Sequence, residues 1–352
     1  MRSQPSMLAR THPVRRSPAL LPPPSPVPRV VAIGGGTGLP VVLQGLRMVC
    51  GSAAPVPPPP EWLTAIVTVM DDGGSSGRLR EALGVLPPGD LRNCLAALVQ
   101  QPSALSTLLN ERLDDEGGVG HPIGNLLLAA LSSTEGDLQQ AVARLGGRIG
   151  ITGRVLPATL ENVHLTAAFH DGSDVRGETA IAARRGRIRT LALERRVRPV
   201  PEVIEALVNA DLIVVGPGSL YTSLLPNLLV DGVAATMSGV TATRVYIANL
   251  MTEPGETDGY SLSDHLRTLY EHTGFELFDY VLVNRALLPA GAVAQYALEG
   301  ARMIDTRGPL DATRATVVAA DLAMVTDRGQ IRHDPVAVGT ALAGLLARRV
   351  ES

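Results

Sequence analysis

Short apolar segments alternate with helical patterns along most of this chain, and this alternation constrains its fold most strongly. Each apolar segment is rich in β-branched residues, and the stretches between them repeat apolar residues at helical spacing. The predicted strands are 30–33, 63–70, 212–215, 244–248, 280–283 and 317–323. The predicted helices include 39–49, 90–99, 122–131, 137–146, 201–209 and 335–348. Strands that alternate with helices predict a doubly wound, mostly parallel, Rossmann-like three-layer α/β/α fold.

Residues 155–195 depart from this alternation. Apolar residues recur there with a period of two, as in the segment 163–167, and Asp171-Gly172 is typical of a turn. With strands expected at 177–182 and 188–193, this region predicts a small antiparallel β insertion. The rest of 29–350 is expected to be a single α/β domain.

Proline-rich segments mark the expected irregular regions. Residues 1–28 are rich in Pro, Ser and Arg and are expected to be a disordered extension, and 51–60 is expected to be a loop.

Composition excludes several kinds of chemistry. All 31 basic residues are arginine, so neither a P-loop lysine nor a Schiff-base lysine is possible. Any phosphate must therefore be bound by backbone N–H groups, hydroxyls or arginine. The net charge is −3 and aromatic residues make up 3%, which argues against a nucleic-acid partner.

Cysteine content and hydropathy bear on the compartment. Cys50 and Cys94 are the only cysteines, so neither a disulfide framework nor a zinc site is expected. No apolar run reaches 18 residues, which argues against a membrane span. We expect a cytoplasmic protein. A homo-oligomer is possible, but the sequence does not specify one.

A glycine-rich loop follows the first predicted strand. Gly34, Gly35, Gly36, Thr37 and Gly38 lie between this strand and a helix, where free N–H groups can bind a phosphate. The dinucleotide fingerprint would place glycine at 39, where this chain has leucine, so the pattern is Rossmann-like without matching it. A tight turn without a ligand is the alternative.

The segment 70–80, MDDGGSSGRLR, concentrates polar groups after the second strand. Asp71 and Asp72 could bind a ribose, hold Mg²⁺ beside a diphosphate, or cap the next helix. The segment also supplies hydroxyl and guanidinium donors suited to an anion: Ser75, Ser76, Arg78 and Arg80.

Two predicted helix starts carry further candidates. Asp90 is either an N-cap or a ligand-binding residue, and Arg92 and Asn93 lie in the same first turn. His121 and Asn125 are four residues apart on one helical face, and His121 could transfer a proton near neutral pH.

Two later loops also follow strands. The loop after 212–215 supplies Gly216, Gly218, Ser219 and Ser223, and the polar loop 249–260 includes Asn249 and Thr252. A second glycine and hydroxyl loop at the same sheet edge predicts a paired nucleotide site. The catalytic candidates remain Asp71, Asp72, Arg78, Arg92 and His121.

Six motifs, in order, resemble the YvcK proteins, known as gluconeogenesis factors, within the wider CofD-like group. They are GGGTGL at 34–39, MDDGGSSGRLR at 70–80, LPPGDLRN at 86–93, GHPIGNLLLAAL at 120–131, GPGSLYTSLLPNLLV at 216–230 and NLMTEPGETDGY at 249–260. Pro122 departs from the small polar residue usual in the family, but it suits a helix start.

The resemblance implies a doubly wound domain that binds UDP-sugars, notably UDP-N-acetylglucosamine. It implies a regulatory role that links carbon metabolism to cell-wall synthesis and cell shape. CofD relatives are Mg²⁺-dependent transferases that move a phospholactyl group from a guanosine diphosphate donor to a deazaflavin. By resemblance, the donor lies near 34–38 and 216–223, and metal-binding carboxylates lie near Asp71 and Asp72.

Three functions follow in order of preference. The first is a nucleotide-sugar-binding regulator, and the second is a Mg²⁺-dependent CofD-like transferase. A nicotinamide-dependent oxidoreductase ranks last because of Leu39, although NAD could occupy the same loops without reacting. Whether the chain is an enzyme stays open, with a binding protein favoured.

Overall fold

The structure is a computed structural model that describes residues 27–51, 58–113, 120–311 and 313–351. The predicted extension 1–28 lies almost entirely outside these residues, as does most of the predicted loop 51–60. None of the helices in the described part of the chain is both long enough and apolar enough to cross a bilayer.

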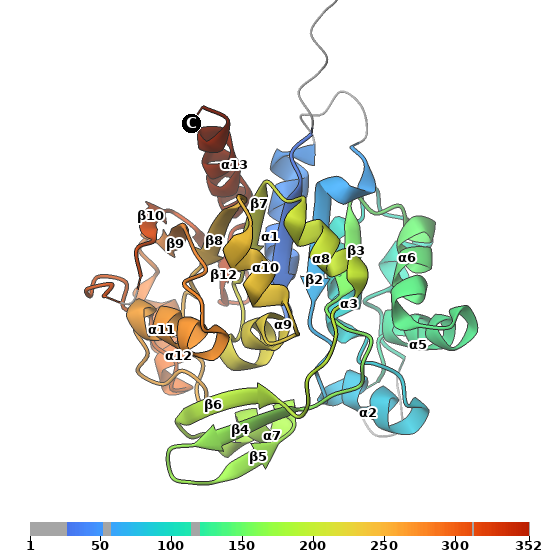
Figure 1. Cartoon of the computed structure of the whole chain (residues 1–352), viewed down its shortest axis with the longest axis horizontal. Coiled ribbons are helices and arrows are strands. Elements are labelled where there is room, and N and C mark those ends of the chain that lie inside the picture. The colour runs from blue at the N-terminus through green and yellow to red at the C-terminus, as the bar shows by residue number, and fades with distance from the viewer. Residues whose placement is uncertain (1–26, 52–57, 114–119, 312, 352) are drawn as a thin grey trace, which may run out of the picture.

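A seven-stranded sheet forms the centre of the described chain, in the order β10-β9-β8-β7-β1-β2-β3 (Figure 1). All the pairings in it are parallel. Its strands are β1 (Val30–Gly34), β2 (Leu63–Val67), β3 (Arg154–Pro157), β7 (Leu212–Val215), β8 (Thr243–Ile247), β9 (Tyr280–Asn284) and β10 (Thr316–Ala320). The strand order reverses at β1, so the sheet is doubly wound as predicted.

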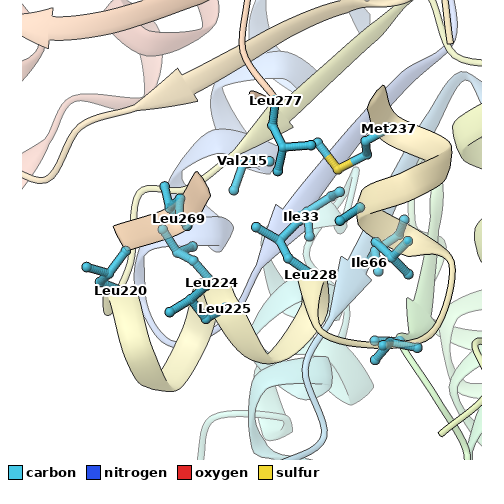
Figure 2. Close-up of a cluster of buried hydrophobic side chains, with 14 of the residues drawn as sticks. Ile33, Ile66, Val215, Leu220, Leu224, Leu225, Leu228, Met237, Leu269 and Leu277 are labelled. Carbon is cyan, nitrogen blue, oxygen red and sulfur yellow. The ribbon is translucent and has the colours of Figure 1, made fainter. Parts of the chain in front are cut away.

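Alternate residues of the central strands enter two separate cores. Val31 and Ile33 of β1 join the core that also holds helices α8 to α11, whereas Val30 and Ala32 join the core on the other face. Figure 2 shows part of the first core, in which Ile33, Leu224 and Leu228 belong to one cluster of buried side chains. The elements on that face are α8 (Pro201–Val208), η3 (Leu220–Leu224), α9 (Leu225–Leu228), α10 (Val233–Gly239) and α11 (Leu262–Thr273).

The second core is covered by α1, α3, α5, α6 and α13, which completes the three layers. These helices are α1 (Gly38–Val49), α3 (Gly89–Leu98), α5 (Ile123–Glu135), α6 (Leu138–Ile149) and α13 (Pro335–Glu351). Further helices are η2 (Pro60–Trp62), α2 (Gly74–Leu83), α4 (Ala104–Leu108) and α12 (Ala290–Leu298).

An antiparallel sheet, β5-β4-β6, lies beside the carboxyl edge of the main sheet (Figure 1). It comprises β4 (Leu165–Phe169), β5 (Asp174–Arg176) and β6 (Ile188–Leu193), with helix α7 (Glu178–Arg184) between β5 and β6. We call residues 163–195 the insertion. Asp72 accepts hydrogen bonds from the amides of Glu178 and Thr179, and His272 accepts one from Leu191, so both sides of the insertion are fastened to the main domain.

Three sequence-based boundaries were wrong. Residues 154–157 belong to the parallel sheet as β3, so the insertion begins after residue 155. The expected strand 177–182 is helix α7, because Asp72 satisfies its first amides and Ile181 is buried. The expected strand 317–323 ends at Ala320, and Ala323–Val325 (β11) instead pairs with Ile331–His333 (β12) in a separate hairpin.

Candidate functional site

The glycine loop after β1 and the loop after β7 meet at the point where the strand order reverses. Together with the loop after β8 they surround a cavity of about 290 Å³, which we call the glycine-loop cavity. Of the predicted residues, it is lined by Gly35, Gly36, Thr37, Gly38, Gly218, Ser219, Ser223, Asn249 and Thr252. The convergence of the three loops therefore agrees with the geometry expected from their positions after adjacent parallel strands.

Close packing explains the glycines of the first loop. Gly36 has a φ of +61°, which disfavours any side chain with a Cβ. A Cβ on Gly38 would lie 2.2 Å from the carbonyl oxygen of Pro217, so the two loops can touch only because residue 38 is glycine. Gly34 and Gly216 lie at the strand ends, outside the cavity lining.

Two of the expected phosphate-binding amides already have protein acceptors. The N–H of Gly36 donates to Asp90 Oδ2 at 2.7 Å, and the N–H of Gly218 donates to Asn249 Oδ1 at 2.9 Å. By contrast, Thr37 is the N-cap of α1 and makes no capping hydrogen bond with its side chain. The N-terminus of α1 is therefore the part of this loop best suited to an anion.

Asp90 is not the N-cap that the sequence suggested. Pro88 occupies that position, and Asp90 lies in the first turn of α3 with its carboxylate directed to the glycine loop. Burial raises its pKa to about 6, helped by the nearby charge of Asp71, although the bond from Gly36 opposes the shift. This long-range contact fastens α3 to the glycine loop.

Two acidic residues lie in the loop after β8, and one of them lines the cavity. Glu253 lines the cavity, and burial raises its pKa, opposed by a hydrogen bond with Ser219. Burial raises the pKa of Glu256 to about 8, with further repulsion from Glu253 and Glu178. Neither glutamate was among the predicted site residues.

The far wall of the cavity comes from the C-terminal part of the chain. Tyr296 and Glu299 from the α12 region and Arg332 and His333 from β12 line it. His333 is buried, which lowers its pKa to about 4, and its Nε2 has no hydrogen-bond partner. These residues belong to no local motif, so no sequence pattern indicated that they would line the same cavity as Gly36.

The adjacent aspartates after β2 bind different segments. Asp71 accepts from the N–H of Gly73 at 2.8 Å, and burial raises its pKa. Burial opposes ionisation of Asp72 as well, but the donors on Thr179 and Glu178 outweigh it and lower the pKa. Asp72 therefore caps α7 rather than α2, the helix that the sequence suggested. The prediction that the pair binds a metal stays a prediction.

Ser75, His121 and Asn125 form a hydrogen-bonded group beside Asp71. Ser75 Oγ lies 2.7 Å from His121 Nδ1 and accepts from Asn125 Nδ2 at 3.1 Å. Asn125 is 2% exposed, and its Oδ1 has no partner. Ser76 is buried and bonds Asp71. The structure thus brings the 70–80 and 120–131 motifs together at one corner.

The arginines have divergent roles. Arg78 is exposed, whereas Arg80 is 6% exposed and directed to the insertion. Arg92 donates to Asn110 Oδ1 and Asn93 Oδ1, both at 2.6 Å, so it binds the loop before α5 instead of an open site. Asn93 lies with Thr37 in a neighbouring hollow of about 340 Å³.

Glu178 extends the acidic surroundings of Asp71. Burial, together with repulsion by Asp71, Asp72 and Asp90, raises its pKa to about 7. This carboxylate comes from the insertion, so no sequence pattern indicated that it would approach residue 71. Across the described ranges, no group of three or more His, Cys, Asp or Glu side chains has metal-binding geometry.

The fold and site together define a doubly wound α/β protein whose glycine-loop cavity lies at the switch point of the parallel sheet. The sequence matches the family described as 2-phospho-L-lactate transferase CofD over residues 30–323. The chain therefore belongs to the CofD family, and within it to the branch of the gluconeogenesis factors.

Relatives and solved structures support this placement. The chain is 40% identical over 321 residues to the gluconeogenesis factor of Bacillus subtilis, covering 91% of this chain and 98% of that protein. It is 42% identical over 312 residues to a relative from Nostoc sp., which corresponds to 88% of this chain but only 66% of the relative.

The crystal structure of protein BH3568 from Bacillus halodurans superimposes with a TM-score of 0.83 at 40% identity. It covers 90% of this chain and 99% of that one. A second crystal structure of BH3568, described as a member of the UPF0052 family, gives the same values.

Proposed function

We propose that this protein is a regulatory protein that binds a nucleotide sugar, UDP-N-acetylglucosamine, at the glycine-loop cavity. The role is to report nucleotide-sugar supply and so to link central carbon metabolism to cell-wall synthesis and cell shape, in the cytoplasm. The proposal places this function in a single CofD-like domain, residues 29–350, and leaves self-association to be measured.

The observation that carries the proposal is the meeting of two βα loops at the switch point of the sheet. Ligands bind in this crevice in doubly wound folds. The uncapped N-terminus of α1, the hydroxyls of Ser219 and Ser223, and Arg332 supply anion donors without lysine. Leu250, Met251 and Ile331 offer an apolar surface suited to a base.

The size of the cavity suggests how such a ligand would lie. A volume of about 290 Å³ is at the small end for small-molecule sites, which span about 300–1,000 Å³. We therefore expect the nucleoside diphosphate to occupy the cavity and the sugar to extend outside it.

A transferase function is the second candidate, favoured by the partly buried carboxylates of Asp71, Asp90 and Glu178. Oxygen ligands of this kind suit Mg²⁺, which commonly uses one or two carboxylates together with substrate phosphates. Asp71 and Asp90 each accept one backbone amide through a single oxygen, so they fit this role better than Asp72, both of whose oxygens accept amides of α7. Bound Mg²⁺ would neutralise charge on a diphosphate.

Isothermal titration calorimetry with UDP-N-acetylglucosamine tests the first function. We expect saturable binding, and Ser223→Ala should weaken it by about fivefold, because one hydrogen bond contributes about 1 kcal/mol. Ser238→Ala, on the exposed surface of α10, is the matched control and should not change the affinity.

Recovery of the ligand separates the two candidates. Unchanged ligand after prolonged incubation with Mg²⁺ and candidate hydroxyl acceptors supports a binding protein. Release of a nucleoside monophosphate that Asp71→Asn abolishes would establish the transferase instead, and absence of any binding heat would contradict both.

A further inference from the structure

A second cavity lies between α2 and the insertion, and none of its lining residues belongs to the glycine-loop cavity. We call it the insertion cavity; its volume is about 570 Å³. Its polar lining comes from both sides: Asp72 and Arg80 from the corner and helix after β2, and His164, Arg176 and Thr179 from the insertion.

Arg80 is a buried cation that makes no direct ion pair, although the carboxylates of Asp72, Asp71 and Glu194 act on it from a longer distance. Its side chain is directed to the insertion, where Nη2 donates to the carbonyl of Val163 at 2.8 Å and to the amide oxygen of Asn162. Both acceptors are neutral, and Nη1 is buried without any acceptor. Among the described residues, no carboxylate oxygen lies within 4 Å of this guanidinium. Because a buried charge needs a partner, this arrangement favours an anion.

Two further cationic or donor groups face the same space. His164 Nδ1 has no hydrogen-bond partner, with the nearest carboxylate oxygen, Asp72 Oδ2, 3.8 Å away. Arg176 is paired with Glu194 at 3.0 Å, but their side chains are 57% and 42% exposed. Exposed pairs of this kind contribute little stability, so Arg176 can change partner at low cost.

The acids around the cavity are already engaged. Asp72 accepts from the amides of Glu178 and Thr179, at 3.0 and 2.8 Å, and Glu194 is held by Arg176. Glu81 is exposed at the rim. The buried charge in this cavity that lacks a direct ion pair is therefore positive, that of Arg80.

We propose that the insertion cavity is a second ligand site, which binds a small anion bearing a phosphate or carboxylate group through Arg80, His164 and Arg176. Guanidinium groups suit both kinds of anion because their paired N–H donors match two oxygens at once. The volume lies within the range of small-molecule sites. A ligand there would bridge α2 and the insertion and so stiffen the element that lies along the carboxyl edge of the sheet.

Histidine NMR on the intact protein tests this proposal at the cavity itself. Inorganic phosphate and citrate are titrated separately while the imidazole resonances of His164, assigned with His164→Gln, are followed. We expect saturable shifts with a dissociation constant below about 10 mM for at least one of the two probes. A response to phosphate alone identifies a phosphate site, and a response to citrate alone a carboxylate site.

Matched variants show whether Arg176 contributes to anion binding. Arg176→Gln should weaken the anion at least fivefold, whereas Arg184→Gln, which removes an insertion arginine paired with Asp171 outside the cavity, should not. The absence of a saturable His164 shift with either probe would overturn the proposal, as would equal weakening by both variants.

Calorimetry with UDP keeps this test separate from the nucleotide site. Arg176→Gln should bind UDP as the wild type does, because the two cavities share no lining residue. Parallel loss of UDP and phosphate binding in this variant would show one continuous site and contradict a second one. Failure of the wild type to bind UDP would instead contradict the proposed nucleotide function.

Discussion

At the residue scale, Asp90 shows how a single carboxylate can organise a site. It is partly buried, and its charge is compensated mainly by one amide, that of Gly36. The carboxylate of Asp90 holds the glycine loop against α3, but its ionisation is disfavoured there and lowers the stability of the folded protein. Such a carboxylate makes the stability depend on pH.

The pKa of Asp90 in the folded protein, about 6, lies above the value of about 3.9 expected for the unfolded chain. The native state therefore holds this proton more tightly, and its contribution to stability falls as pH rises from about 4 to 6. Asp90→Asn keeps an oxygen for Gly36 but cannot ionise. Urea denaturation should find the variant equal to wild type near pH 4 and up to about 3 kcal/mol more stable at pH 7.5.

Asp174→Asn, an exposed position in β5, is the control and should leave the pH profile unchanged. If Asp90→Asn and wild type differ by a constant amount across this pH range, the carboxyl group does not titrate as the structure indicates.

At the element scale, the insertion depends on contacts from the main domain. Helix α7 begins after Gly177, which has no side chain to cap it, and Asp72 supplies the missing acceptors from 106 residues away. A Cβ at Gly177 would lie 2.7 Å from Asp72 Oδ2, so the glycine also makes room for this carboxylate. The helix therefore forms where its local sequence lacks the usual start signal.

Asp72→Ala should loosen α7 specifically. Loss of a capping carboxylate costs about 1–2 kcal/mol, and amide hydrogen exchange should accelerate in residues 178–184. Asp137→Ala is the matched control, since Asp137 caps α6 through the amide of Gln140 at 2.8 Å. It should accelerate exchange in the first turn of α6 and leave α7 unchanged. Unchanged amide exchange in α7 of the Asp72→Ala variant would show that the helix does not depend on this capping carboxylate.

At the scale of the whole molecule, the C-terminal helix helps to position one wall of the glycine-loop cavity. Helix α13 packs on α1 through two glycines, and a Cβ on Gly339 would lie 2.4 Å from the carbonyl oxygen of Gly45. Strand β12 immediately precedes α13 and places Arg332 and His333 in the cavity wall. The position of this wall therefore depends on how closely the two helices approach.

Gly339→Ala should separate α13 from α1, with a loss of about 1–3 kcal/mol in unfolding free energy from overpacking. The affinity for UDP should fall as well, because β12 moves with the helix. Gly344→Ala, in the same helix with open space around it, should instead stabilise by about 0.5–1 kcal/mol and keep the affinity. Thermal denaturation and calorimetry on both variants measure these effects. Unchanged UDP affinity in Gly339→Ala would show that this wall does not contact the ligand.

The amino-acid sequence alone was enough to predict the order and type of most elements, and the loops that meet at the switch point. The predicted strands 30–33 and 212–215 and the glycines after them are recognisable because period, β-branching and conformational freedom are local properties. Parallel pairing then places the ends of these strands at one edge of the sheet, whatever the detailed packing.

Which side chains come together at this edge of the sheet became clear only from the folded molecule. Asp90 binds Gly36 across 54 residues, Asp72 caps a helix in the insertion, and His333 joins the cavity from the far end of the chain. No local pattern encodes these contacts, since each depends on how separately predicted elements dock. For the same reason, the two cavities and the unpaired guanidinium of Arg80 became visible only in the folded molecule.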